Sequence, residues 1–309
     1  MPAAGTDRPH VVVIGGANVD VKARSTARAV PATSNPGTTS LSAGGVGRNV
    51  AENLARLGAS VHLVAAVGRD QLGDQLLADT DAAGVEIGAV VRTDRPTGTY
   101  TAVLDSDGEL VTAVADMGAT DLLGTEDVRR VSPLVAAADL LVLDGNLSVA
   151  ALQAALELAA DAHVPVALDP VSVPKARRLR ELIDRALPLF LVTPNAAELD
   201  ALGGDVDHLH ARGVEHVWVR LGSAGSRLST RNAGAQPLSP VPAPVADVTG
   251  AGDAMLAAFC HGVLSGRSPV EAARLGHAAA ALTVASPHTV RPDLSLDLVE
   301  QVSSARSTT

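Results

Sequence analysis

Short apolar runs alternate along this chain with segments of helical period. The runs are "HVVVIGG" (10–16), "SVHLVAAVG" (60–68), "ADLLVLDG" (138–145), "VPVALDP" (164–170), "LFLVTPN" (189–195) and "HVWVRLG" (216–222). We expect a helix after each run, as at 148–162, 174–187 and 250–265. Strands that are apolar at nearly every position and separated by helices are typical of a parallel sheet covered on both faces. The alternation therefore predicts an α/β fold, doubly wound around a mainly parallel sheet, in a single domain over 1–309.

Composition excludes several classes of partner. The 309 residues are 47% hydrophobic, which is enough to bury a large core. The formal net charge is -10 and aromatic residues make up 1%, whereas a nucleic-acid surface needs basic patches and stacking rings. Residues 1–10 lack the plan of a signal peptide, and no apolar run approaches the roughly 18 residues of a membrane span. We expect a soluble, cytoplasmic protein that binds neither nucleic acid nor membrane, with its one cysteine, Cys260, buried among apolar neighbours.

Two segments interrupt the alternation. Residues 17–43 are rich in Ser, Thr, Pro and Ala and have no helical period, and residues 97–117 read as two strands around the turn "DSDG". Together they are expected to form a small sheet outside the main domain. Such a sheet suits a lid over the strand ends and equally suits a contact between two subunits. We expect a homodimer formed through this lid.

Ligands of doubly wound sheets bind beyond the carboxyl ends of the strands. The polar residues and the glycine that end or follow the apolar runs are Asn18, Asp20, Asp144, Asp169, Asn195 and Gly222. The only lysines are Lys22 and Lys175, and neither follows a glycine, so no GxxxxGK[ST] phosphate loop is present. Any nucleotide phosphate must be bound by backbone amides, arginines and a metal.

The stretch "ADVTGAGDAM" (246–255) places Gly250, Ala251 and Gly252 directly before Asp253. Free amides at a helix start form an anion site, and glycines allow a phosphoryl group to approach the backbone closely. Asp253 then stands where it would accept a proton from an attacking hydroxyl. A carboxylate that only complements the helix dipole is the alternative, and this motif alone does not decide between them.

The stretch "SAGGVGRNVAENLARLG" (42–58) predicts a helix preceded by Gly44 and Gly45, with Asn49 in its first turns. That helix start suits sugar hydroxyls, although glycines before a helix are also ordinary loop residues. Asn18 and Asp20, two apart in an extended segment, project to the same side and suit a ribose diol, unless they form a surface turn.

Two further junctions suit a nucleotide. Asn195 and Glu198 lie three apart at a strand-to-helix junction, where a carboxylate can hold a water-coordinated Mg²⁺; a solvated first-turn acid is the alternative. The loop "LGSAGS" (221–226), with Gly222 and Gly225, suits nucleotide contact or a plain hairpin.

In their order along the chain, these motifs resemble the ribokinase-like carbohydrate and nucleoside kinases, the PfkB family. "AGGVGRNVAENLARLG" followed by Gly68 has the spacing of the family's N-terminal signature, and "DVTGAGDAM" resembles its C-terminal signature. The resemblance implies an ATP-dependent kinase acting on a primary hydroxyl, with Asp253 as base and the amides of residues 250–252 as anion hole. It implies that Asn195 and Glu198 serve phosphate and Mg²⁺.

Within the family, four pieces resemble the pseudouridine kinase branch. They are "SNPG" (34–37), "GGVGRN" (44–49), "DM" (116–117) and "PDLS" (292–295). Ribokinases usually have lysine and alanine at the positions of Val46 and Arg48. The resemblance implies phosphorylation of the 5′-hydroxyl of pseudouridine. It implies that the ribose is held by Asn18, Asp20, Gly44, Gly45 and Asn49, and that the base faces Thr99 and Asp116.

The chain also departs from the family pattern. Val248 stands where the signature often has a serine or threonine. Family members often bind a monovalent cation, and Asp247 with Thr249 would contribute oxygens to K⁺.

Other functions remain open at this stage. The substrate is alternatively ribose, adenosine, inosine or another sugar or nucleoside. From another class, "VVVIGGANVD" (11–20) opens like the strand of a dinucleotide-binding oxidoreductase, although it lacks GxGxxG.

Overall fold

A computed structural model describes residues 8–185 and 189–305. Within these residues, nine strands form the main sheet in the order β15-β14-β13-β12-β11-β10-β1-β4-β6. Their bounds are β1 His10–Ile14, β4 Ser60–Val64, β6 Val85–Glu86, β10 Leu140–Asp144, β11 Val166–Asp169, β12 Leu191–Val192, β13 His216–Arg220, β14 Ser226–Thr230 and β15 Gly234–Leu238. The strands from β6 to β13 pair in parallel. The doubly wound, mainly parallel sheet predicted from the alternation is confirmed.

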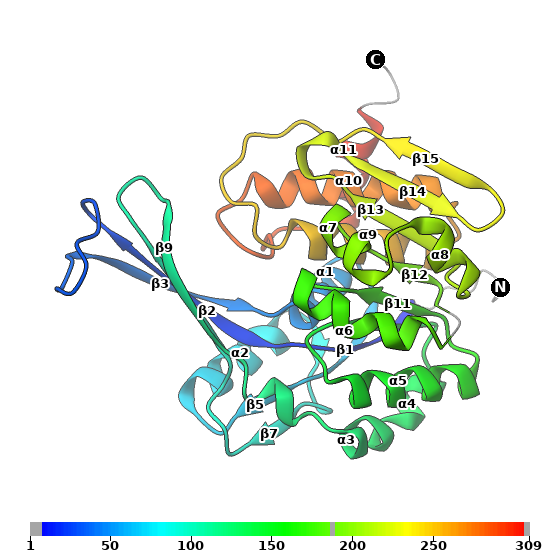
Figure 1. Cartoon of the computed structure of the whole chain (residues 1–309), viewed down its shortest axis with the longest axis horizontal. Helices are drawn as coiled ribbons and strands as arrows, with labels where there is room; N and C mark the ends of the chain where they lie inside the picture. The colour runs from blue at the N-terminus through cyan, green and yellow to red at the C-terminus, as the bar shows by residue number, and fades with distance from the viewer. Residues whose placement is uncertain (1–7, 186–188, 306–309) are drawn as a thin grey trace.

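Helices cover both faces of this sheet (Figure 1). Along β1, Val11 and Val13 pack into one core cluster, whereas Val12 and Ile14 pack into the other. On the first face lie α1 Val46–Arg56, α2 Gln71–Ala82, α9 Ala251–Leu264, α10 Pro269–Val284 and α11 Leu296–Ser304. On the second lie α3 Thr125–Arg130, α4 Ser132–Ala136, α5 Val149–Ala162, α6 Val173–Ile183, α7 Ala196–Leu202 and α8 Val206–Ala211. Burial on both faces explains why the strands lack a polar alternation.

Three local expectations differ from the structure. The run 60–68 is two strands, since β5 (Ala66–Gly68) leaves the main sheet and pairs with β7 (Val91–Thr93). A single 3-10 turn (Gly222–Ala224), and no α-helix, follows β13; the chain turns at Gly222 and Gly225, whose φ angles are 58° and 92°, into the antiparallel hairpin β14–β15. The helix expected over 174–187 ends at Ile183, and residues 186 and 187 lie outside the described part of the chain.

A separate four-stranded sheet projects from the left of the body in Figure 1. Its order is β3-β2-β8-β9, with bounds β2 Asn18–Ser25, β3 Gly37–Gly44, β8 Thr99–Leu104 and β9 Leu110–Asp116. Both segments that interrupt the alternation therefore contribute to one sheet. Exposed apolar side chains lie on its strands, namely Leu41, Leu110, Val111 and Val114.

Trp218, the only tryptophan, is fully buried where β13 meets α9 and α10. Its indole Nε1 donates to the hydroxyl of Ser226 at 2.8 Å, and its ring lies 5.2 Å from that of Phe259. A Cβ at Gly276 would lie 2.4 Å from the ring, so α10 can pack this closely only with glycine there.

Cys260 is fully buried beside this cluster, as predicted, and burial raises the pKa of its thiol. Among the described helices, none is long and apolar enough to cross a membrane.

Candidate active site

The first turn of α9 carries no side-chain cap. Its N-cap is Gly250, which has a φ angle of 81°, a conformation that side chains other than glycine rarely adopt. A Cβ there would lie 1.9 Å from the carbonyl oxygen of Thr289, so the close approach is made by the chain's own backbone. The first amides of a helix have no helical partner, and here no side chain of the N-cap satisfies them. The Ala251 amide donates to the Val248 carbonyl at 3.4 Å, so the start of α9 is held by backbone alone and remains positively polarised.

Asp253 lies in that first turn and is 8% exposed. Its Oδ2 accepts a hydrogen bond of 2.8 Å from Nδ2 of Asn49 on α1. Burial raises the pKa of Asp253 to about 8; the Asn49 hydrogen bond opposes the shift, Asp169 adds to it, and the charge of Arg220 opposes it. A carboxylate with a pKa near the working pH can both accept and release a proton. The alternative, a carboxylate that only complements the helix dipole, does not account for the hydrogen bond to Asn49 on another helix.

Arg220, at the end of β13, lies against the same helix start. A Cβ on Gly252 would approach its Nη1 to 2.5 Å, so a side chain there would displace the guanidinium. Nη1 pairs with Asp169 at 2.9 Å, and Nη2 lies 3.6 Å from Glu198. No motif in the sequence predicted a role for Arg220. The available signal was an arginine at a strand end in a chain with only two lysines.

Asn195 and Glu198 form a reciprocal capping box at the start of α7. The Asn195 side chain accepts from the Glu198 amide at 2.9 Å, and Glu198 accepts from the Asn195 amide at 2.8 Å. Glu198 is 3% exposed, so the expectation of a solvated acid is wrong, and burial raises its pKa. Among the described residues, no group of three His, Cys, Asp or Glu side chains forms a ready metal cage.

Asp144, at the end of β10, binds two backbone segments at the carboxyl edge of the sheet. Its Oδ2 accepts from the amides of Gly16 at 2.8 Å and Gly47 at 2.7 Å. It therefore joins the loop after β1 to the start of α1. Its Oδ1 accepts from the amide of Asn146 at 2.8 Å, so both carboxylate oxygens hold backbone amides.

The residues expected to hold a ribose come together at the base of the four-stranded sheet. Asn18 faces Gly44 in the register of β2 and β3, and its Nδ2 donates to Oδ1 of Asp20 at 2.8 Å. A Cβ at Gly44 would lie 2.6 Å from the Asp20 carboxylate, and one at Gly45 would lie 2.4 Å from the Gly16 carbonyl. Burial raises the pKa of Asp20.

Thr99 and Asp116 are register partners on β8 and β9, and β8 also pairs with β2 at Val19. Thr99 is half-buried and Asp116 is exposed. These two residues lie on the same sheet as Asn18 and Asp20, one or two strands away.

Asp247 and Thr249 lie in the loop before α9. Oδ1 of Asp247 accepts from the amide and hydroxyl of Thr249, at 2.9 and 2.7 Å. Oδ2 pairs with the ammonium group of Lys22 on β2 at 2.5 Å. A monovalent cation here would have to share the Asp247 carboxylate with Lys22 and Thr249. The Lys22 contact joins the four-stranded sheet to the loop that leads into α9.

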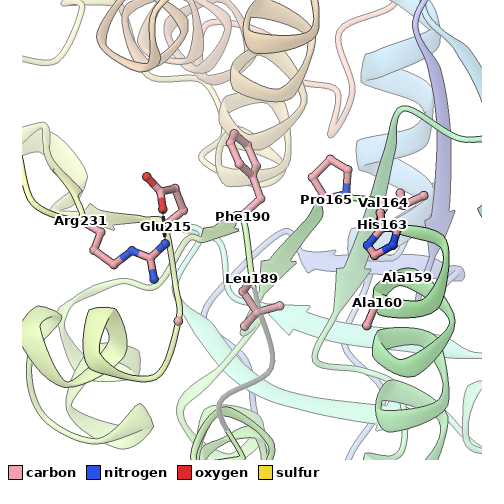
Figure 2. A pocket seen from close by; sticks show the side chains of 10 residues that line it. Ala159, Ala160, His163, Val164, Pro165, Leu189, Phe190, Glu215 and Arg231 are labelled. Atoms are coloured by element: carbon pink, nitrogen blue, oxygen red, sulfur yellow. Dashed lines mark hydrogen bonds and ion pairs between the residues drawn. The ribbon is translucent and has the colours of Figure 1, made fainter. Parts of the chain in front are cut away.

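A cavity of about 380 Å³ lies away from the candidate site residues and is lined by Pro165, Phe190, Glu215 and Arg231, among others. Figure 2 shows the ion pair of Glu215 and Arg231 at its edge. Pro165, Phe190 and Glu215 directly precede β11, β12 and β13, and Arg231 follows the antiparallel β14, so the cavity lies at the amino edge of the parallel strands. It contains none of the candidate residues, which gather at the carboxyl edge.

Comparisons with known proteins agree with this geometry. Residues 8–295 match the model of the pfkB family carbohydrate kinases. An Escherichia coli (strain K12) protein named pseudouridine kinase is 33% identical over 302 residues, which cover 94% of this chain and 95% of the relative. A carbohydrate kinase from Agrobacterium tumefaciens has a TM-score of 0.84 at 34% identity, covering 96% of this chain and 97% of that one. The structure of Arabidopsis thaliana ribokinase complexed with ribose and ATP has a TM-score of 0.81 at 26% identity, covering 96% of this chain and 99% of that one.

Proposed function

The chain belongs to the pfkB family of carbohydrate kinases, and from that premise we propose that it transfers the γ-phosphoryl group of ATP to the 5′-hydroxyl of pseudouridine. Membership of a kinase family removes the oxidoreductase alternative. The observation that carries the proposal is Asp253, a buried carboxylate with a raised pKa at an uncapped helix start. The similarity to a pseudouridine kinase over nearly the whole chain supports the substrate.

The nucleotide is proposed to bind with its terminal phosphate at residues 250–252. The amides at the start of α9 and the guanidinium of Arg220 supply positive charge there. Gly222 and Gly225, in the turn after β13, are proposed to contact the nucleotide.

The donor set also fits Mg²⁺, because this ion usually takes one or two carboxylates and completes its shell with waters and phosphate oxygens. Glu198 would hold the ion through water. Asp169 lies close to Glu198, because both carboxylates pair with Arg220. When bound, Mg²⁺ would neutralise phosphate charge. We assign no step to potassium.

Asp253 is proposed to orient the 5′-hydroxyl and to accept its proton as the oxygen attacks the γ-phosphorus. The bond between the γ-phosphorus and the bridging β,γ-oxygen breaks, and ADP leaves with that electron pair. The helix start and Arg220 stabilise the charge on the transferred group. The acid limb of the rate profile in the free enzyme is expected near pH 8, because Asp253 must be ionised to act.

The four-stranded sheet is proposed to act as a lid that excludes water, with Thr99 and Asp116 toward the base. Its exposed apolar side chains support a homodimer formed through this sheet. We further propose a cytoplasmic location.

The test is ADP release with Mg·ATP across pseudouridine, uridine, ribose, adenosine and inosine, with Asp253→Asn as the blank. Strong turnover of pseudouridine that depends on Asp253 supports both chemistry and substrate. Turnover of ribose or another nucleoside instead keeps the kinase and replaces the substrate; the likeness to a ribokinase makes ribose the second candidate.

A further inference from the structure

Arg48 is a buried cation that the proposed chemistry does not use. It lies on α1, is 4% exposed, and stands next to Asn49 in the chain. Its Nη1 donates to Oδ1 of Asn49 at 3.0 Å and its Nε donates to the hydroxyl of Thr80 at 3.3 Å; its Nη2 pairs with Glu52. Burial lowers the pKa of Arg48 to about 10, so it remains charged at neutral pH. The Asn49 side chain lies between the Arg48 guanidinium and the Asp253 carboxylate and bonds to both.

The donors of Arg48 determine which way the Asn49 amide faces. An amide presents a carbonyl oxygen on one side and two N–H donors on the other, and a guanidinium has only donors. With the Asn49 oxygen held by Arg48, the Asn49 Nδ2 faces Asp253 at 2.8 Å. The reversed amide would place its donors against the guanidinium and its oxygen against the carboxylate, so both contacts would become repulsive.

The consequence reaches the protonation state of Asp253. An N–H donor stabilises the carboxylate, whereas an amide oxygen stabilises only the neutral acid. Among the described residues, the charged groups that act on Asp253 are Arg48 on α1, Arg220 on β13, Asp169 on β11 and Asp144 on β10. The two aspartates and burial oppose ionisation, so Asn49 and the arginines must favour it.

We propose that Arg48 is a positioning residue that fixes the Asn49 amide with its N–H toward Asp253 and so keeps Asp253 available as a proton acceptor. This inference rests on the proposed function, in which Asp253 accepts the proton of the substrate hydroxyl. It also gives a role to a position at which ribokinases usually carry alanine.

The first experiment compares wild type with Arg48→Met in kcat/KM over a pH series. Without Arg48 the amide is free to rotate, so the acid limb moves to higher pH by about one unit. The loss in kcat/KM is about tenfold near pH 7 and small at pH 9 and above, while KM for ATP stays within about twofold. Arg48→Lys, which keeps a donor and a charge, restores part of the shift.

Arg56→Met is the matched control. Arg56 lies on the same helix and donates to the same Glu52 at 2.8 Å, but its Nη1 donates to the carbonyl of Pro292, and Arg56 is not part of the proposed site. Its loss leaves the acid limb in place. A uniform loss of rate at all pH values in Arg48→Met, with the limb unmoved, would show that Arg48 is only structural and would overturn the proposal.

Two further measurements keep the test decisive. If Arg48→Met does not fold, the double variant Arg48→Met/Glu52→Gln removes the buried carboxylate together with its partner, and the same shift is expected. The pKa of Asp253 is also measured without substrate, by NMR titration of ¹³C-labelled aspartate with Asp253→Asn for assignment. A higher pKa in the Arg48 variant supports the inference even if the substrate panel gives no turnover, and an unchanged pKa refutes it even if the kinase activity is established.

Discussion

Helices α9 and α10 follow each other in the chain and pack together, yet they begin in opposite ways. Each has an acid as its third residue, Asp253 in α9 and Glu271 in α10. Glu271 is exposed and accepts from the amide and hydroxyl of its own N-cap, Ser268, and these bonds lower its pKa. Asp253 is buried and burial raises its pKa to about 8. The same helical position therefore gives a stabilising cap in one helix and a reactive group in the other.

The difference shows what marks a functional helix start. In α10 the cap satisfies the backbone from within the helix, which leaves nothing for a ligand. In α9 the N-cap is a glycine without a side chain, and the carboxylate is turned toward Asn49 on another helix. The start of α9 therefore lacks the stabilisation of a side-chain cap, and of its first amides Ala251 donates to the Val248 carbonyl at 3.4 Å.

The largest expected effect is on turnover when the reactive acid is removed. Asp253→Asn keeps the shape but removes the proton acceptor, so kcat is expected to fall by about 10³-fold or more. Glu271→Gln at the equivalent position of α10 should change kcat by less than about twofold. ADP release measures both, and comparable losses in the two variants would remove the contrast between the helices.

A smaller effect is expected from adding a methyl group at the α9 start. Gly250→Ala meets both an unfavourable φ of 81° and the Thr289 carbonyl at 1.9 Å, so we expect a loss of about 2–3 kcal/mol in unfolding free energy, together with reduced kcat/KM. Gly266→Ala is the control, because Gly266 has a φ of 82° but no atom within 4 Å of the added carbon. Its loss should be about 1 kcal/mol with normal activity. Equal denaturant midpoints for both variants would contradict this account.

The raised pKa of Asp253 predicts a pH dependence of stability. Its folded pKa of about 8 exceeds the unfolded value of 3.8, so the folded state binds this proton more tightly. That contribution is complete below pH 3.8 and is lost as pH rises toward 8. Relative to wild type, the stability of Asp253→Asn should therefore rise by about 3–4 kcal/mol between pH 5 and pH 8, in urea unfolding at each pH. A constant difference across that range would argue against a raised pKa.

The smallest effect belongs to the α10 cap. Ser268→Ala removes the acceptor for the Glu271 amide and the hydroxyl donor to Glu271, and should lower the unfolding free energy by about 1 kcal/mol. Activity should not change, because nothing in the proposed site touches Ser268. A measurable fall in kcat at unchanged protein concentration would mean that the two helix starts are coupled.

Much of this fold follows from short-range patterns. The apolar runs predicted the parallel strands because burial on both faces removes the polar alternation, and the glycine-led motifs marked the starts of α1 and α9. The split of 60–68 was missed because Ala65 continues the apolar pattern although the chain leaves the sheet there. The hairpin after β13 was one of two alternatives for the loop 221–226, since a glycine turn is compatible with either connection.

The contacts within the site were harder to predict. Asn49 and Asp253 are 204 positions apart in the sequence, and no local pattern states that they share a hydrogen bond. Arg220 and its two carboxylate partners lie on three different elements, which only the order of the strands brings together. The sequence indicated which residue types were available, and the topology decides which of them meet.

The position of Trp218 makes this protein convenient for spectroscopy. As the only tryptophan, it makes indole fluorescence report on one place, where β13 meets α9 and α10. Its full burial should shift its emission to short wavelengths. Trp218 lies on β13 only two residues before Arg220, and its hydrogen bond to Ser226 ties it to the neighbouring strand β14. Any ligand that moves α9 against α10 would change that emission, so binding can be followed in the unlabelled protein in real time.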